Sequence, residues 1–269
     1  MLRAFLLPLA SLIFLAATPA TAQNAQEQAQ LAEALARGKL LYEIDVAGWV
    51  STDAMMAKAP EAAKWPIRGW LVEPDPAVPH AWDVVYYLQP GGEGADALPA
   101  FRARVENGKV TESAAVPEAE RRPLSAAQMR MVRAIEVARE ADYKPCTPAR
   151  FNVTVVPPST PEAPLEVYLL SAQTETQVFP IGGHHKLTFA PDGTLIARRP
   201  FMRSCLNMDA RTMPAGAGAA SLFVNHLLDP IPTEMHVLSS IQIGTPIFVG
   251  TRKKRTWAVT PEGITLMKR

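Results

Sequence analysis

The chain has 269 residues, of which 27 are Lys or Arg and 26 are Asp or Glu, and 48% are hydrophobic. A chain so close to neutral lacks the basic field that gathers phosphate backbones, which excludes nucleic acid as an expected partner. The hydrophobic fraction supports a packed core and excludes a largely disordered chain.

The N-terminus has the pattern of a secretory signal peptide. Arg3 supplies a positive charge, an apolar run covers residues 6–17, and Ala20-Thr21-Ala22 is a small-residue cleavage site. That run is shorter than the ~20 apolar residues needed to span a bilayer, and no later segment is apolar enough. We therefore expect Met1 to Ala22 to be removed, and the mature protein to be periplasmic or secreted with no integral membrane segment.

The next part of the chain predicts two helices and then a set of strands. A polar helix is expected over 25–37, with Gly38 as its stop. A second helix is expected over 41–59, although Tyr42, Ile44 and Val46 alternate with polar residues as in a strand. The strands are expected at 68–76, at 80–92 and on both sides of Asn107-Gly108, a strong hairpin signal.

The following part predicts the same order of elements. A helix is expected over 124–142, begun by a capping box of Ser125 and Gln128. The strands are expected at 150–158, at 163–175 and on both sides of Asp192-Gly193. Gly193 lies 85 residues after Gly108, which suggests an internal repeat, although a chance likeness of two meanders gives the same spacing.

These elements predict an α+β fold of two similar units, each a helix followed by an antiparallel meander. The first unit is expected over 23–117 and the second over 118–269. The second also carries an additional C-terminal set of antiparallel strands, expected at about 234–243, 246–250, 255–259 and 263–267.

The chain has two cysteines, Cys146 and Cys205. An even number of cysteines in an exported protein favours a disulfide, because an oxidising compartment does not preserve exposed thiols. A catalytic thiolate at Cys205, or two buried free thiols, are the alternatives that the residues leave open. Ser204 lies beside Cys205 but lacks the sequence context of a hydrolase nucleophile.

The adjacent histidines His184 and His185 are expected within a strand that begins at Gly183. Neighbouring side chains of a strand point to opposite faces. His185 is then on the apolar face, as a core histidine or as one contributor to a site, and His184 is on the polar face. The pair cannot bind one metal ion from that strand.

The segment around Glu234 and His236 is the second candidate for chemistry. In a strand these two residues share a face, and a carboxylate beside an imidazole orients the ring and raises its basicity. The candidate catalytic residues are therefore His185, Glu234 and His236, and the candidate metal ligands are His185, His226 and His236, because imidazole suits zinc. Nothing in their spacing requires either site, so we expect no cofactor.

The stretches GGHHKLTFAPDG, RSCL and DPIPTEMHVLSS make the chain resemble exported bacterial proteins of unknown function, over most of residues 40–260. The resemblance implies export and no particular activity. The leading interpretation is an exported binding or envelope-associated module with a small-molecule or envelope partner. The alternatives are a metal-dependent hydrolase with a His/Glu cluster and a module that self-associates through its sheet edges.

Overall fold

The computed structural model describes residues 19–88, 95–212 and 222–267, with side chains from residue 24 onward. Of the predicted signal peptide, residues 1–18 lie outside this part, and residues 19–22 begin the first helix. No helix within the described ranges combines the length and the apolar character that a membrane span requires.

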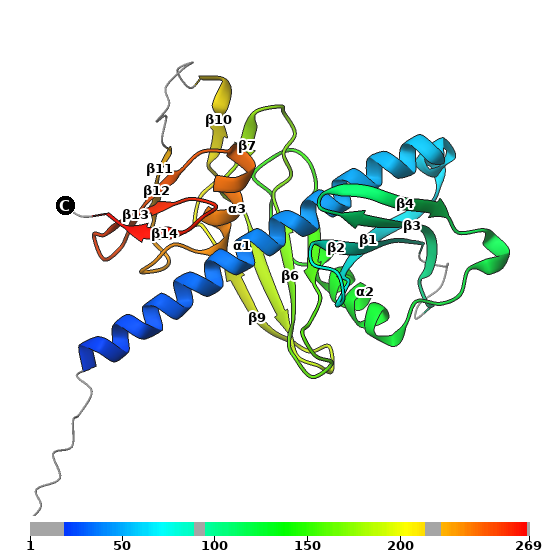
Figure 1. Ribbon diagram of the computed structural model, residues 1–269, viewed down its shortest axis with the longest axis horizontal. Helices are drawn as coiled ribbons and strands as arrows, with labels where there is room; N and C mark the ends of the chain where they lie inside the picture. The colour runs from blue at the N-terminus through cyan, green and yellow to red at the C-terminus, as the bar shows by residue number, and fades with distance from the viewer. Residues whose placement is uncertain (1–18, 89–94, 213–221, 268–269) are drawn as a thin grey trace, which may run out of the picture.

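The first element is one continuous helix, α1 (Pro19–Lys58), which runs the length of the molecule (Figure 1). The prediction of two helices separated at Gly38 is therefore wrong. Gly38 lies inside this helix, and helix α3 packs closely against it: a Cβ there would lie 2.5 Å from the Cβ of Val237. The glycine serves close packing between two helices and not helix termination.

The first sheet is a four-stranded antiparallel meander in the order β1-β2-β3-β4. Its strands are β1 (Ile67–Pro74), β2 (Ala81–Leu88), β3 (Leu98–Glu106) and β4 (Lys109–Ala115), and the short 3-10 helix η1 (Pro60–Lys64) leads into it. Asn107 and Gly108 both have positive φ, 49° and 74°, as the predicted hairpin turn requires. Tyr86 and Phe101 on one face pack against α1.

Helix α2 (Ala126–Arg139) covers the other face of this sheet and also packs against the second sheet. The 3-10 helix η2 (Glu118–Glu120) precedes it. The predicted capping box of α2 is confirmed: Gln128 N–H donates to Ser125 Oγ, and Ser125 N–H donates to Gln128 Oε1. Leu71 and Val85 of the first sheet and Val167 of the second meet around this helix, so α2 joins the two sheets through one apolar core.

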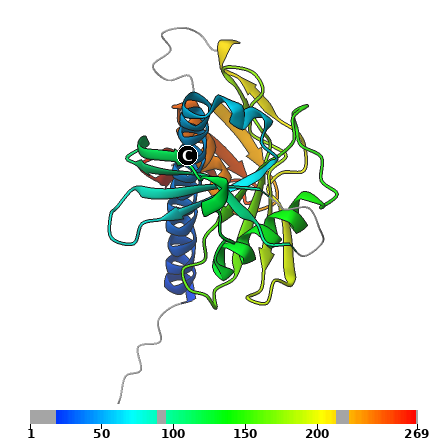
Figure 2. The same ribbon diagram turned by 90° about the vertical axis from the view of Figure 1, so that its right-hand side faces the viewer.

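The second sheet is also a four-stranded antiparallel meander, in the order β5-β6-β8-β9. Its strands are β5 (Asn152–Val156), β6 (Leu165–Leu170), β8 (His185–Phe189) and β9 (Leu195–Pro200). Seen from the side, this sheet lies along one flank of α1 (Figure 2). A separate antiparallel pair consists of β7 (Val178–Pro180) and β10 (Asn207–Asp209), followed by the 3-10 helix η3 (Ala210–Thr212). Common descent of the two meanders stays a prediction.

The C-terminal part contains β11 (Leu222–His226), α3 (Glu234–Ile243), β12 (Ile247–Thr251), β13 (Thr256–Val259) and β14 (Ile264–Leu266). The strand predicted at 234–243 is wrong, because this segment is helix α3. It ends at Gly244, whose φ of 70° is the left-handed conformation of a helix C-terminus. Strand β11, which was not predicted from the sequence, pairs in parallel with β12, and helix α3 is the connection between these two strands in the chain. The other three predicted C-terminal strands are confirmed.

The α+β class is confirmed, with antiparallel sheets and one parallel strand pair. The predicted disulfide is also present: Cys146, in the loop after α2, is bonded to Cys205, in the loop after β9, at a sequence separation of 59. The bridge therefore connects the start and the end of the segment that contains the second sheet.

Candidate functional site

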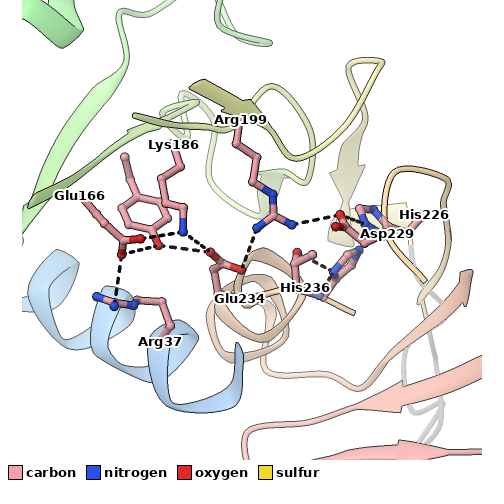
Figure 3. A network of polar contacts seen from close by, with 10 residues as sticks. Arg37, Glu166, Lys186, Arg199, His226, Asp229, Glu234 and His236 are labelled. Atoms are coloured by element: carbon pink, nitrogen blue, oxygen red, sulfur yellow. Dashed lines mark hydrogen bonds and ion pairs between the residues drawn. The ribbon is translucent and has the colours of Figure 1, made fainter. Parts of the chain in front are cut away.

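Three of the candidate residues, His226, Glu234 and His236, lie in one charged network between α1, the second sheet and the start of α3 (Figure 3). Beside the network is a cleft of about 250 Å³, formed by α1, by Lys186 and Arg199 of the sheet, and by the loop 229–234. The network and the cleft together are the candidate functional site.

At one end of the network, Glu166 on β6 joins the sheet to helix α1. Its carboxylate accepts a hydrogen bond of 2.8 Å from Lys186 Nζ and forms an ion pair of 3.2 Å with Arg37 of the helix. Lys186 stands on the neighbouring strand β8, whose register with β6 places it diagonally from Glu166. All three side chains are more than half buried, so water screens these pairs less than at an open surface.

At the centre of the network, Glu234 is the first residue of α3. Its carboxylate accepts a hydrogen bond of 3.2 Å from the Tyr168 hydroxyl and lies 3.6 Å from Lys186 Nζ and 4.0 Å from Arg199. The helix N-terminus also favours a negative charge at this position. Burial raises the pKa of Tyr168, and the carboxylates of Glu234 and Glu166 raise it further, so the phenol stays protonated and donates.

At the other end, Asp229 receives two donors on one oxygen. Arg199 lies 3.0 Å and His226 Nε2 lies 2.8 Å from Asp229 Oδ2. Burial alone raises the pKa of Asp229, but the hydrogen bond from His226 and the charge of Arg199 outweigh burial and lower it. Asp229 is therefore an ionised carboxylate that fixes the proton of His226 on Nε2.

His226 and His236 are buried and in contact, with ring centroids 4.7 Å apart and nearly perpendicular planes. His236 Nδ1 accepts a hydrogen bond of 3.0 Å from the Thr233 N–H at the start of α3. Burial, and then the neighbouring His226, lowers the pKa of His236 to about 3, so this ring is neutral at pH 7. His226 Nδ1 has no hydrogen-bond partner in the part of the chain that the structure describes.

The predicted shared face of Glu234 and His236 is wrong. Each step along a helix turns the side chain by about 100°, so residues two positions apart point about 200° apart, to nearly opposite sides. Glu234 points to Lys186, and His236 points to His226. The predicted triple with His185 does not form either. His185 stacks on Tyr143 at 3.9 Å, in a separate aromatic cluster. No group of three or more metal-ligand side chains occurs among the described residues.

His185 shares a face of β8 with the buried Leu187 and Phe189, as predicted, but His184, predicted on the polar face, is the more deeply buried of the two. The strand begins only at His185, because Gly183 has a φ of 75° and interrupts the alternation. His184 Nδ1 accepts from the Ser171 N–H at 3.1 Å, and His184 Nε2 donates to the Pro180 carbonyl at 3.0 Å. Burial lowers the pKa of His184 to about 4. This ring is the core histidine with backbone hydrogen bonds.

Sequence reasoning missed the residues that complete the network: Arg37, Glu166, Lys186 and Arg199. One signal was present in β6, where Glu166 alternates with Leu165 and Val167 and shares a face with the buried Tyr168. A carboxylate on an apolar strand face needs a cationic partner. The residue that supplies it depends on which elements meet.

Comparison of the chain with protein-family models, with curated proteins and with solved structures finds no match.

Proposed function

We propose that the protein is an exported binding protein whose cleft takes a small ligand with both an acidic and a basic group. The observation that carries this proposal is the lining of the cleft, where Arg37, Lys186 and Arg199 stand near Asp229 and Glu234. Guanidinium and ammonium groups recognise a carboxylate, and the carboxylates recognise an amine. The small volume favours a ligand the size of an amino acid.

The burial of the two imidazoles and the lowered pKa of His236 favour binding over catalysis. His226 is 1% exposed and His236 is 3% exposed, so a ligand in the cleft reaches neither ring without a rearrangement. A general base must lie within hydrogen-bond reach of the proton that it removes and needs a pKa near the working pH. His236, with its pKa lowered to about 3, does not meet the second requirement.

Export is supported by the signal-like N-terminus together with the disulfide. Cys205 is exposed, and the reducing cytosol does not keep exposed disulfides oxidised. We expect the mature protein to begin at Gln23 in the periplasm or the medium, with Cys146 bonded to Cys205. Cell fractionation with N-terminal sequencing and non-reducing peptide mass mapping tests this. An uncleaved chain in the cytosol with two free thiols would contradict it.

The ligand class is tested by titration calorimetry with the standard amino acids as probes. We expect at least one amino acid to bind the unaltered protein, and Arg199→Gln to weaken its binding about fivefold, the effect of losing one partly exposed charge pair. Arg198→Gln is the matched control, because Arg198 is exposed on the opposite face of the same strand. Equal affinities of the two variants, or no heat with any amino acid, would reject the cleft as this binding site.

A metal-dependent hydrolase built on the same residues is the alternative proposal, because His226 and His236 are in contact, but the described residues do not gather three ligands there. Asp229 on His226 resembles the carboxylate that orients a metal-bound imidazole. Metal analysis of untagged protein separates the two proposals. Stoichiometric zinc that is lost in His236→Ala and retained in the surface variant His80→Ala would favour the hydrolase, and protein without metal would reject it.

A further inference from the structure

A second cavity, of about 650 Å³, lies where the start of β1, the end of α2 and the loop 140–151 meet. It shares no lining residue with the cleft beside α1. Its walls are mainly apolar and come from Ile67, Tyr143, Pro145, Phe151, Val153 and Leu169. An apolar cavity with a few polar groups is typical of small-molecule sites.

The charged groups of this cavity are three arginines, Arg68, Arg139 and Arg150, and one carboxylate, Glu140. Glu136 on α2 serves two of them: its Oε1 accepts a hydrogen bond of 2.6 Å from Arg139, and its Oε2 accepts from Arg68. Arg150 is exposed and has no ion pair with any carboxylate that the structure describes. Three guanidinium groups and two carboxylates leave an excess of one positive charge.

The backbone of β1 is shaped around these arginines. The register with β2 shifts between Ile67 and Gly69, so Arg68 is the extra residue of a β-bulge, a feature that re-aims a side chain. A Cβ at Gly69 would lie 2.9 Å from Arg139 Nη2 and 2.7 Å from the Tyr87 hydroxyl. Glycine at this position therefore leaves room for the Arg139 guanidinium beside the cavity.

The part of the lining that comes from residues 143–151 is held in place by aromatic stacking and by the disulfide. Tyr143 stacks on His185 at 3.9 Å, and Phe151 meets the same ring edge-on at 5.9 Å. Between them in sequence, Cys146 is bonded to Cys205, and its N–H donates to Ser171 Oγ at 3.0 Å. A wall that is fixed before binding costs less conformational entropy when a ligand is bound.

We propose that this cavity binds an amphipathic monoanion. An apolar or aromatic body packs against Tyr143 and Phe151, and a carboxylate, sulfonate or phosphodiester head is bound by Arg150 and Arg68. The excess of one guanidinium sets the charge of the head, and the planar donors of arginine suit its oxygens. The apolar wall selects an amphiphile over a free inorganic anion. This site does not depend on the function proposed for the first cleft.

The test uses two fluorescent probes with the full-length mature protein. Anilinonaphthalene sulfonate is an aromatic monoanion, and phenylnaphthylamine has the same rings without the sulfonate. We expect the sulfonate probe to bind more tightly, and Arg150→Gln to weaken its binding about fivefold, as loss of one partly exposed ion pair does. The same variant should not alter the affinity for the neutral probe. Decanoate, a monoanionic amphiphile, should displace both probes.

Two control variants complete the test. Arg133→Gln removes an exposed arginine from α2 outside the cavity and should alter neither affinity. Ala149→Trp fills the cavity and should reduce the binding of both probes, with circular dichroism to show that the fold persists. Equal affinities for the sulfonate probe in Arg150→Gln and the unaltered protein would overturn the proposal. A neutral probe that binds as tightly as the anionic one would do the same.

Discussion

The His184 ring connects two segments through its nitrogens, accepting from the Ser171 N–H and donating to the Pro180 carbonyl. The bond that Nδ1 accepts requires the neutral ring, whereas Nε2–H can donate in either protonation state. Because its pKa is lowered to about 4 from 6.5, the unfolded chain binds a proton over this pH range and the folded chain does not. The stabilisation is therefore complete above pH 6.5 and is lost as the pH falls through about 4.

We expect the contribution of His184 to lower the free energy of unfolding by about 3 kcal/mol as the pH falls from 6.5 to 4, because each unit of pKa difference corresponds to ~1.4 kcal/mol. Urea unfolding at several pH values measures it. We expect His184→Gln to lower the free energy of unfolding at pH 7 and to make it depend less on pH. The surface variant His80→Gln should keep the pH dependence of the unaltered protein. His236 adds a loss of the same sign that extends to about pH 3. An unchanged pH slope in His184→Gln would contradict this account.

Gly38 lies where α1 and α3 pack closely against each other. In an open helix Gly→Ala stabilises by ~1 kcal/mol. Here the new methyl would lie 2.5 Å from Val237 Cβ and 2.8 Å from the Glu234 carbonyl oxygen, so the helices must separate. We expect Gly38→Ala to destabilise the protein by about 1–3 kcal/mol, as overpacking does.

Thermal and urea unfolding measure this change. Gly263→Ala is the control, because a Cβ at that position meets nothing within 4 Å. It should shift the free energy of unfolding by less than ~0.5 kcal/mol. A stabilised Gly38→Ala variant would show that the helix packing relaxes without cost.

At the scale of elements, the disulfide holds the loop after α2 against the loop after β9. Cross-linking residues 59 apart restricts the unfolded chain, with a loop-entropy contribution of ~4 kcal/mol. We expect the double variant Cys146→Ser, Cys205→Ser to lose stability by about this amount. Hydrogen exchange should increase most over residues 140–151 and 201–209. The matched control is Ser204→Ala, next to Cys205, which should unfold as the unaltered protein does.

The two meanders were predictable from the sequence because their signals are local. Alternating apolar residues and the turns Asn107-Gly108 and Asp192-Gly193 specify strands and hairpins within about fifteen residues. Helix α3 was not predictable in this way. Its residues are buried on several sides, by α1 and by β12, so they show no single apolar stripe and resemble a strand.

At the scale of the molecule, α1 contacts both the first sheet and the C-terminal strands (Figure 1). Its N-terminal half is fastened by Leu31, which packs with Ile231 and Trp257. Arg255 adds two hydrogen bonds of 2.7 Å to Glu27 and lies over the Trp257 ring. A helix end without such contacts frays in water.

We therefore expect Arg255→Gln to increase amide hydrogen exchange over residues 24–35 and to leave residues 40–58 unchanged. The second range packs independently against the first sheet. Hydrogen-exchange mass spectrometry measures both ranges, and Arg252→Gln, an exposed neighbour, is the control. Equal exchange in both variants would show that the apolar contacts alone hold this end of α1.

The sequence by itself determined the α+β class, the two meanders, the capping box of α2 and the partner of each cysteine. These features depend on neighbours in sequence or, for the cysteines, on there being only two. Only the tertiary structure decided that α1 continues through Gly38, that 234–243 is helical, and that Arg37, Lys186 and Arg199 meet Glu166, Asp229 and Glu234. Local propensities amount to less than ~1 kcal/mol per residue, whereas burial and ion pairing depend on elements far apart in the chain.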